Sequence, residues 1–166
     1  MTDLGRILIA DDEHTFLDSM ADLLRREGYP CIFHPDYYGA EYEDKGKDGN
    51  TYHITMPSHR FLIDTFLHAR QHYAYGPQYD YFDHPNTIGW ARFGDEDHPG
   101  GMAVLMSNGG DGWKWMATEY PNAIYTDSTG HITTPVVTNN DGWGKFMCTG
   151  GKVSVWLPFY DGINNG

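Results

Sequence analysis

The stretch MAVLMSNGGDGWKWMA, residues 102–117, holds two short apolar runs separated by a glycine-rich turn. Each run has the length of a β-strand, and the Gly, Asp and Asn residues between them favour tight turns. The same alternation continues on both sides and predicts strands over residues 87–92, 102–107, 114–117, 123–127, 136–138, 144–148 and 153–157. Regular short strands of this kind predict a mainly β fold, an antiparallel Greek-key sandwich.

Before these strands the apolar residues follow the period of a helix. Residues 58–75 carry an apolar stripe that starts at a candidate N-cap, Ser58, and stops at Gly76 and Pro77. Residues 5–28 are typical of a strand followed by a helix. We therefore expect a β-α-β-α segment ahead of the β-sandwich.

Between these helices the chain is short of periodic signals. A brief apolar run at residues 31–33 predicts a second strand, and a polar, glycine-rich loop is expected over 35–50. Together with the β-rich part, this pattern suggests three regions, 1–27, 28–76 and 77–166.

Length and charge exclude several classes of protein. A chain of 166 residues suits one domain with an appended unit and is too short for a complete eight-fold β/α barrel. Its formal net charge of −12 would repel phosphate backbones and anionic lipids, so we expect no nucleic-acid partner and no membrane partner. Cys31 and Cys148 indicate neither a disulfide framework nor a zinc cluster. The apolar run at 7–10 is too short for a signal peptide, so a cytoplasmic location is expected.

An acidic pair, Asp11 and Asp12, directly follows the strand predicted at 7–10. This segment resembles the start of a response-regulator receiver domain, where such a pair helps to hold Mg²⁺. A receiver also needs a phospho-accepting aspartate downstream, and the nearest matching motif here, HITMP, has His53 in that place. A degenerate receiver-type signalling module is therefore only an alternative.

A second set of motifs appears in fixed order along most of the chain: GYPCIFHPDYYG (28–39), ARQHYAYG (69–76), DYFDH (80–84), IGW (88–90), HPGGMAVLMSN (98–108) and NDGWG (140–144). This run resembles the C-terminal part of a bacterial α-amylase of glycoside hydrolase family 13. The resemblance spans residues 28–158. It implies that 29–34 is the last barrel strand, 58–75 the last barrel helix, and 78–158 the all-β C-terminal domain of that family.

The resemblance does not bring catalytic residues with it. Retaining glycosidases need two carboxyl groups that flank the scissile bond, and in α-amylases these come from earlier barrel strands. We assign no catalytic residue and expect a C-terminal α-amylase fragment that is not catalytic alone. An accessory subunit that complements a separate amylase barrel is the other alternative.

Two groups of residues are candidates for contact with α-glucan. Asp36, Tyr37 and Tyr38 would follow the last barrel strand, where barrel active sites are built, although packing within the loop is the other interpretation. Trp113 and Trp115 are two residues apart on a predicted strand and should share one face, whereas Trp90 and Trp156 are expected in the core.

The resemblance also implies a candidate Ca²⁺ site of the complete parent enzyme, at the Pro85 carbonyl and the Asn86 and Asn108 side chains. The other interpretation is that these residues only form turns, where Pro and Asn are common. Carboxylates in place of the two asparagines would bind Ca²⁺ more tightly. His68 and His72, four apart on the predicted helix, lack a third metal ligand in the sequence pattern.

Overall fold

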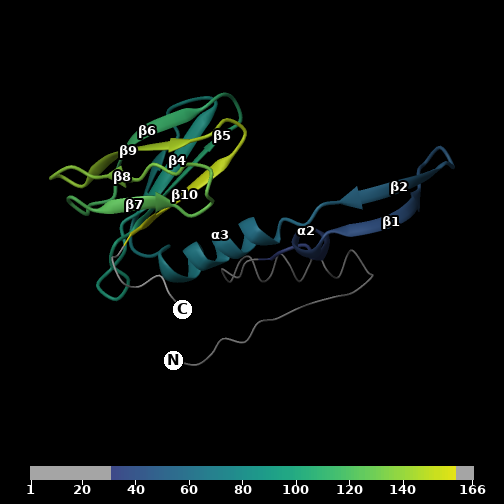
Figure 1. The fold of residues 1–166 in the computed structure, drawn as a ribbon, viewed down its shortest axis with the longest axis horizontal. Helices are drawn as coiled ribbons and strands as arrows, with labels where there is room; N and C mark the ends of the chain where they lie inside the picture. The colour runs from purple at the N-terminus through teal and green to yellow at the C-terminus, as the bar shows by residue number, and fades with distance from the viewer. Residues whose placement is uncertain (1–30, 160–166) are drawn as a thin grey trace. The chain divides into compact units, whose positions relative to one another are not determined.

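The computed structural model describes residues 31–159, which divide into two compact units between Arg60 and Phe61 (Figure 1). Each unit is described by itself. The strand and helix expected over 5–28, with Asp11 and Asp12, lie outside the described residues, as do positions 29 and 30.

The first unit contains a short helix and a β-hairpin. Helix α2 (His34–Tyr38) has Pro35 in its first turn, where a missing N–H is tolerated. Strands β1 (Ala40–Lys45) and β2 (Thr51–Met56) pair antiparallel in register from Ala40–Met56 to Lys45–Thr51. The expectation of a polar loop over 35–50 is therefore wrong. The tip explains why the hairpin closes: Asp48 accepts hydrogen bonds from the Asn50 backbone N–H and, at 2.6 Å, from the Tyr52 hydroxyl.

The strand expected at 29–34 is not found in its described part. Residues 31–33 belong to no helix or strand, and His34 already begins α2. A strand requires a neighbour that accepts and donates its backbone hydrogen bonds. None of the strands in residues 31–159 pairs with this run, so its apolar character alone does not make it a strand.

The second unit confirms the mainly β, antiparallel fold. One sheet has six strands in the order β3-β4-β5-β10-β7-β8, and β6 and β9 form a second sheet. The strands are β3 (Gln78–Tyr81), β4 (Thr87–Arg92), β5 (Met102–Ser107), β6 (Gly112–Ala117), β7 (Ile124–Asp127), β8 (Val136–Val137), β9 (Trp143–Cys148) and β10 (Val153–Pro158). We call β3–β10 the β-domain. Its strand order departs from chain order because β10 lies between β5 and β7.

The main core lies between the two sheets. Alternate residues of each strand face it, including Leu105 of β5, Phe146 of β9 and Trp156 of β10, all fully buried. The Phe146 ring meets Tyr125 and Trp156 edge-on at centroid distances of 5.5 and 5.9 Å. The core position predicted for Trp156 is thus confirmed.

Helix α3 (Arg60–His72) packs through its C-terminal part against the other face of the six-stranded sheet. Ala69 is its one buried residue and packs in a cluster with Met102 and Val104 of β5 and Val155 of β10. Trp90 is half-buried beside this second cluster. The second unit therefore consists of two packed sheets, with α3 held against the outer face of the six-stranded sheet through this cluster.

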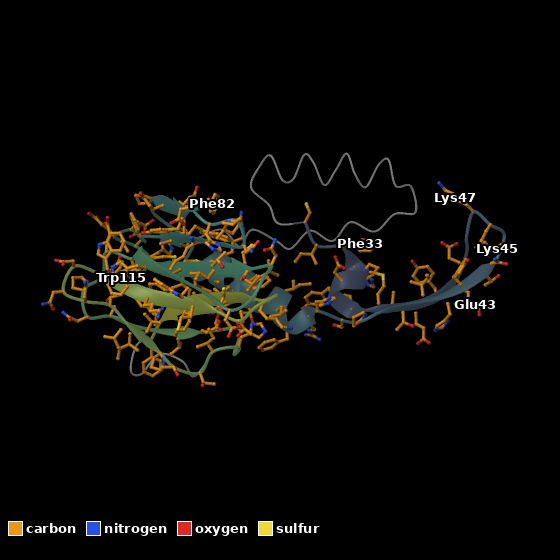
Figure 2. The ribbon with its side chains drawn as sticks, turned by 90° about the horizontal axis from the view of Figure 1, so that it is seen from above. Phe33, Glu43, Lys45, Lys47, Phe82 and Trp115 are labelled. Carbon is orange, nitrogen blue, oxygen red and sulfur yellow. The ribbon has the colours of Figure 1, made fainter. Side chains whose placement is uncertain are left out.

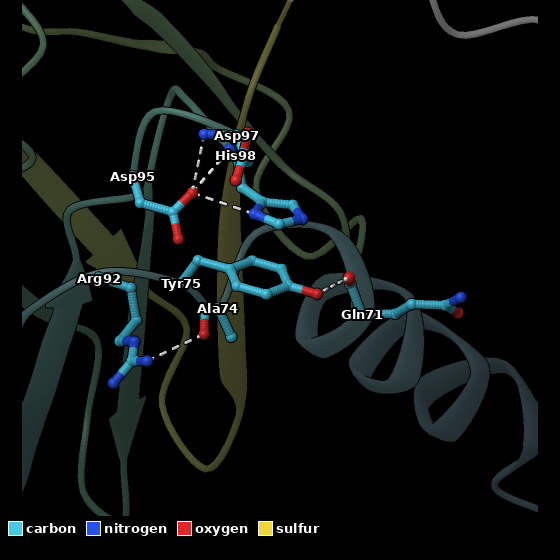
Figure 3. A network of polar contacts seen from close by, with 7 residues as sticks. All are labelled: Gln71, Ala74, Tyr75, Arg92, Asp95, Asp97 and His98. Carbon is cyan, nitrogen blue, oxygen red and sulfur yellow. Dashed lines mark hydrogen bonds and ion pairs between the residues drawn. The ribbon is translucent and has the colours of Figure 1, made fainter. Parts of the chain in front are cut away.

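A polar network fixes the end of α3 to the loop after β4 (Figure 3). The Tyr75 ring stacks on His98, with ring centroids 3.5 Å apart and planes 5° from parallel. Asp95 holds the loop by accepting a 2.7 Å hydrogen bond from the His98 backbone N–H, and the His98 ring nitrogen Nδ1 lies 3.0 Å from the same carboxylate. Arg92 donates to the Ala74 carbonyl at 3.0 Å. These contacts tie the helix to the sheet where the chain enters β3.

Candidate functional site

The outward face of the β6–β9 sheet carries a group of aromatic side chains. The register pairs Trp113 with Met147, Trp115 with Lys145 and Ala117 with Trp143. Residues paired in this way share a face of the sheet, and residues two apart on one strand share it too. We call this set the aromatic face: Trp113, Trp115, Ala117, Trp143, Lys145 and Met147.

The two tryptophans proposed for sugar contact are open to solvent. Trp113 is 59% and Trp115 49% exposed, and Figure 2 labels Trp115 on the β-domain. Because the alternate residues Lys114 and Met116 are buried, strand β6 has a clear inner and outer side. The tryptophans therefore stand on a strand whose position the core determines.

A lysine lies over one of these rings. The Lys145 ammonium is 4.7 Å from the centroid of the Trp113 ring, within the range of a cation–π contact. Lys145 comes from β9 and is directly opposite Trp115. Lys145 is therefore a neighbour of both tryptophans on this face, and its ammonium lies over Trp113.

The edges of the aromatic face are anchored by residues of β3 and the turn that follows it. Tyr81 accepts a 2.9 Å hydrogen bond from the Ala117 backbone N–H, and its ring meets Trp143 at 6.5 Å and 84°. Burial raises the pKa of the Tyr81 hydroxyl. On the inner side, the buried Lys114 ammonium donates to Asp83, and this hydrogen bond lowers the pKa of the Asp83 carboxyl.

The first candidate group, Asp36, Tyr37 and Tyr38, lies on α2 in the first unit. The Ser58 hydroxyl donates a 2.6 Å hydrogen bond to the Tyr37 carbonyl, and the Arg60 guanidinium lies 5.5 Å from the Tyr37 ring centroid. The Asp36 carbonyl accepts a 2.8 Å hydrogen bond from the His59 backbone N–H. These contacts fix the helix within its own unit, whereas Trp113 and Trp115 belong to the second.

Pro85, Asn86 and Asn108 are brought together by the turns that flank β4 and β5. The Asn108 backbone N–H donates to the Asn86 carbonyl at 3.1 Å, and all three residues line a groove of about 280 Å³. Lys152 lines the same groove, which has no carboxylate in its lining. Two amides, a carbonyl and an ammonium do not fit Ca²⁺, which prefers carboxylate oxygens. Within residues 31–159, no group of three or more His, Cys, Asp or Glu side chains could hold a metal ion.

The sequence pattern missed Lys145 and Tyr81 as parts of this surface. Alternation along residues 144–148 does place Lys145 on the opposite side of the strand from Phe146. What the sequence lacks is the pairing of β9 with β6, which brings Lys145 to the tryptophans.

No helix in the described part of the chain is long and apolar enough to cross a membrane.

Comparison with known proteins gives a consistent result. Residues 102–157 match the family model of the α-amylase C-terminal domain. The chain is 45% identical over 139 residues to an α-amylase of Geobacillus stearothermophilus, which covers 82% of this chain and 23% of that protein. It is 47% identical over 137 residues to the cytoplasmic α-amylase of Escherichia coli K12, and the match covers 81% of this chain and 27% of that protein. An α-amylase of Bacillus licheniformis is 39% identical over 138 residues, and the match covers 81% of this chain and 25% of that protein.

These matches confirm the resemblance to the C-terminal part of an α-amylase. The chain spans about a quarter of the length of the relatives it matches.

Proposed function

We propose that this chain, which carries the C-terminal domain of the α-amylases, contacts α-glucan through its aromatic face and takes no part in bond cleavage itself. The observation that carries the proposal is the pair of exposed tryptophans, Trp113 and Trp115, on one face of a strand that the core holds in place.

The chemistry of the pair suits a sugar polymer. The flat apolar face of an indole packs against the C–H groups of a pyranose ring, and its edge N–H donates to a hydroxyl oxygen. Side chains two residues apart on a strand lie about 7 Å from each other, so neighbouring parts of one chain of sugars can meet both rings. A β-sheet also presents the rings with little loss of conformational freedom on binding.

The proposal gives residues 31–159 no role in cleaving the glycosidic bond. A retaining glycosidase needs two carboxyl groups held about 5 Å apart on either side of the bond, one as nucleophile and one as acid. We assign neither role to a residue in 31–159. Hydrolysis of α-glucan by the purified chain alone would contradict this part of the proposal.

Replacement of Trp115 by alanine should weaken binding to a soluble α-glucan about tenfold, the effect of removing one aromatic anchor. Trp113→Ala should act in the same direction. The binding constant can be measured by the retardation of the protein in native gels that contain increasing glucan.

The matched control is Phe61→Ala, which removes another exposed aromatic ring, 65% exposed, from α3 on the opposite side of the six-stranded sheet. Its binding should equal that of the unchanged chain. Equal retardation of all three variants would show that the aromatic face does not bind glucan.

A second candidate function, the completion of a separate catalytic barrel, is supported by the exposed apolar surface of α3. Phe61 and Phe66 are 65% and 38% exposed, and Phe66 lines an apolar groove of about 400 Å³ between α3 and the sheet. An apolar surface of this kind is typical of a face that another protein segment covers. The relatives are about three to three and a half times as long as this chain, so such a segment is available in them.

Co-expression with the catalytic barrel of an α-amylase relative should yield a complex that purifies as one species. Phe66→Glu should prevent this, because a carboxylate in an apolar interface loses its hydration. Gln71→Glu adds the same charge at an exposed position near the C-terminal end of α3, and it should leave the complex intact. Separate elution of the two unchanged chains would refute this second function.

A further inference from the structure

The side chains of the aromatic face donate hydrogen bonds but hardly accept them. The three indoles of Trp113, Trp115 and Trp143 each offer an N–H donor, and the Lys145 ammonium offers three. Ala117 offers no side-chain partner, and Met147 only a weak thioether acceptor. The outward side chains of β6 and β9 therefore present donors almost exclusively.

A neutral glucan can pair with such a surface only through its hydroxyl and ring oxygens. Each sugar hydroxyl both donates and accepts, so a face of donors pairs with the oxygen and leaves the hydroxyl hydrogen to water. An anionic ester accepts only, and its hydrogen bonds to an ammonium are charge-assisted and stronger. A donor-rich aromatic face therefore favours a sugar that carries negative charge.

Lys145 is placed to provide this contact. Its ammonium rests over the Trp113 ring, opposite Trp115, and among the described residues no carboxylate lies within ion-pair distance of it. The cation–π contact orients the ammonium without neutralising its charge. The remaining N–H groups are free to meet a ligand stacked on the neighbouring indole.

The acidity of the whole chain does not remove this preference. The formal net charge is −12, but at physiological salt the screening length is about 8 Å, so charges near the face dominate. The exposed carboxylates nearest along the strands belong to Asp111, Glu119 and Asp141, each four residues from the Trp115–Lys145 pair and so about 13 Å away along a strand. Asp111 accepts a 2.9 Å hydrogen bond from the Gly150 backbone N–H.

We propose that the aromatic face prefers α-glucan bearing phosphate monoesters, with stacking by Trp113 and Trp115 and with Lys145 as the phosphate contact. This inference rests on the proposed function, and it adds the class of glucan that the face selects.

The test compares one phosphorylated α-glucan with the same preparation after enzymatic removal of its phosphate. The unchanged chain should bind the phosphorylated form about fivefold more tightly, the upper effect for an exposed pair of charges. Lys145→Met keeps the length and apolar stem of the side chain and should lose the difference, so that it binds the phosphorylated and the dephosphorylated glucan equally. Lys145→Arg should keep the difference.

The outcomes separate the two proposals. Equal binding of both glucans by the unchanged chain would overturn the phosphate preference and leave the glucan-binding proposal standing. Binding of neither glucan would overturn both. Inorganic phosphate, added alone at the concentration of the esters, should compete weakly; full displacement of the phosphorylated glucan by it would show a free-anion site and would also refute the inference.

Discussion

Replacement of Trp156 by alanine should lower the free energy of unfolding of the β-domain by about 3–5 kcal/mol, the range for removal of a large aromatic side chain from a core. Trp156 is fully buried on β10, between β5 and β7, and its ring meets Phe146 edge-on. Its indole N–H donates a 3.0 Å hydrogen bond to the Met147 carbonyl of the opposite sheet. Truncation therefore leaves both a cavity and a carbonyl without its partner.

The measurement is urea unfolding of the full chain, followed by far-UV circular dichroism. Trp115→Ala is the matched control, because the same residue type is removed from a position 49% exposed. Its effect should stay within about 0.5 kcal/mol. Similar losses in the two variants would mean that the core between the two sheets does not determine the stability of the β-domain.

The sequence predicted the β-domain well because its strands are buried on one side at least. The expected ranges 87–92 and 102–107 coincide with β4 and β5, where runs of apolar residues end at turn residues. Local pattern is sufficient there, since one face of each strand must avoid water. The outward direction of Trp113 and Trp115 follows from the same alternation.

The hairpin of β1 and β2 was missed because it lacks this signal. Neither strand contains a buried residue, and charged side chains such as Glu41, Glu43 and Lys45 follow one another along β1, as Figure 2 shows for the last two. The strand expected at 29–34 failed for the opposite reason: its run is apolar, but in the described residues it has no strand to pair with. Strand formation depends on pairing, which single-chain periodicity does not contain.

The candidate site shows the same limit. Trp113 and Trp115 could be singled out from spacing alone, whereas Lys145 could not, because it lies 30 residues from Trp115 and reaches it only through the register of β6 with β9. The contact that distinguishes a neutral from a charged ligand is thus a consequence of tertiary structure.

Gly76 occupies the point where the chain leaves α3, and its replacement should be among the most damaging single changes. Its φ of 70° lies in the left-handed region, and an added Cβ would stand 1.7 Å from the Gly94 carbonyl oxygen. The two segments approach so closely because the Gly94 backbone N–H donates a 3.0 Å hydrogen bond to the Tyr75 carbonyl. Gly76→Ala should cost at least about 4 kcal/mol, because the atoms on both sides of this contact belong to the backbone and neither segment can move away.

Gly130→Ala separates steric overlap from backbone strain. Gly130 has a similar φ of 75°, but an added Cβ there meets nothing within 4 Å. This variant should cost only about 1 kcal/mol, the strain of an alanine in the left-handed region. The difference between the two midpoints of urea unfolding therefore measures how rigidly the network of Figure 3 holds the end of α3 against the loop after β4. If Gly76→Ala were as mild as Gly130→Ala, this junction would have to be free to separate, and the stacking of Tyr75 on His98 could not be what secures it.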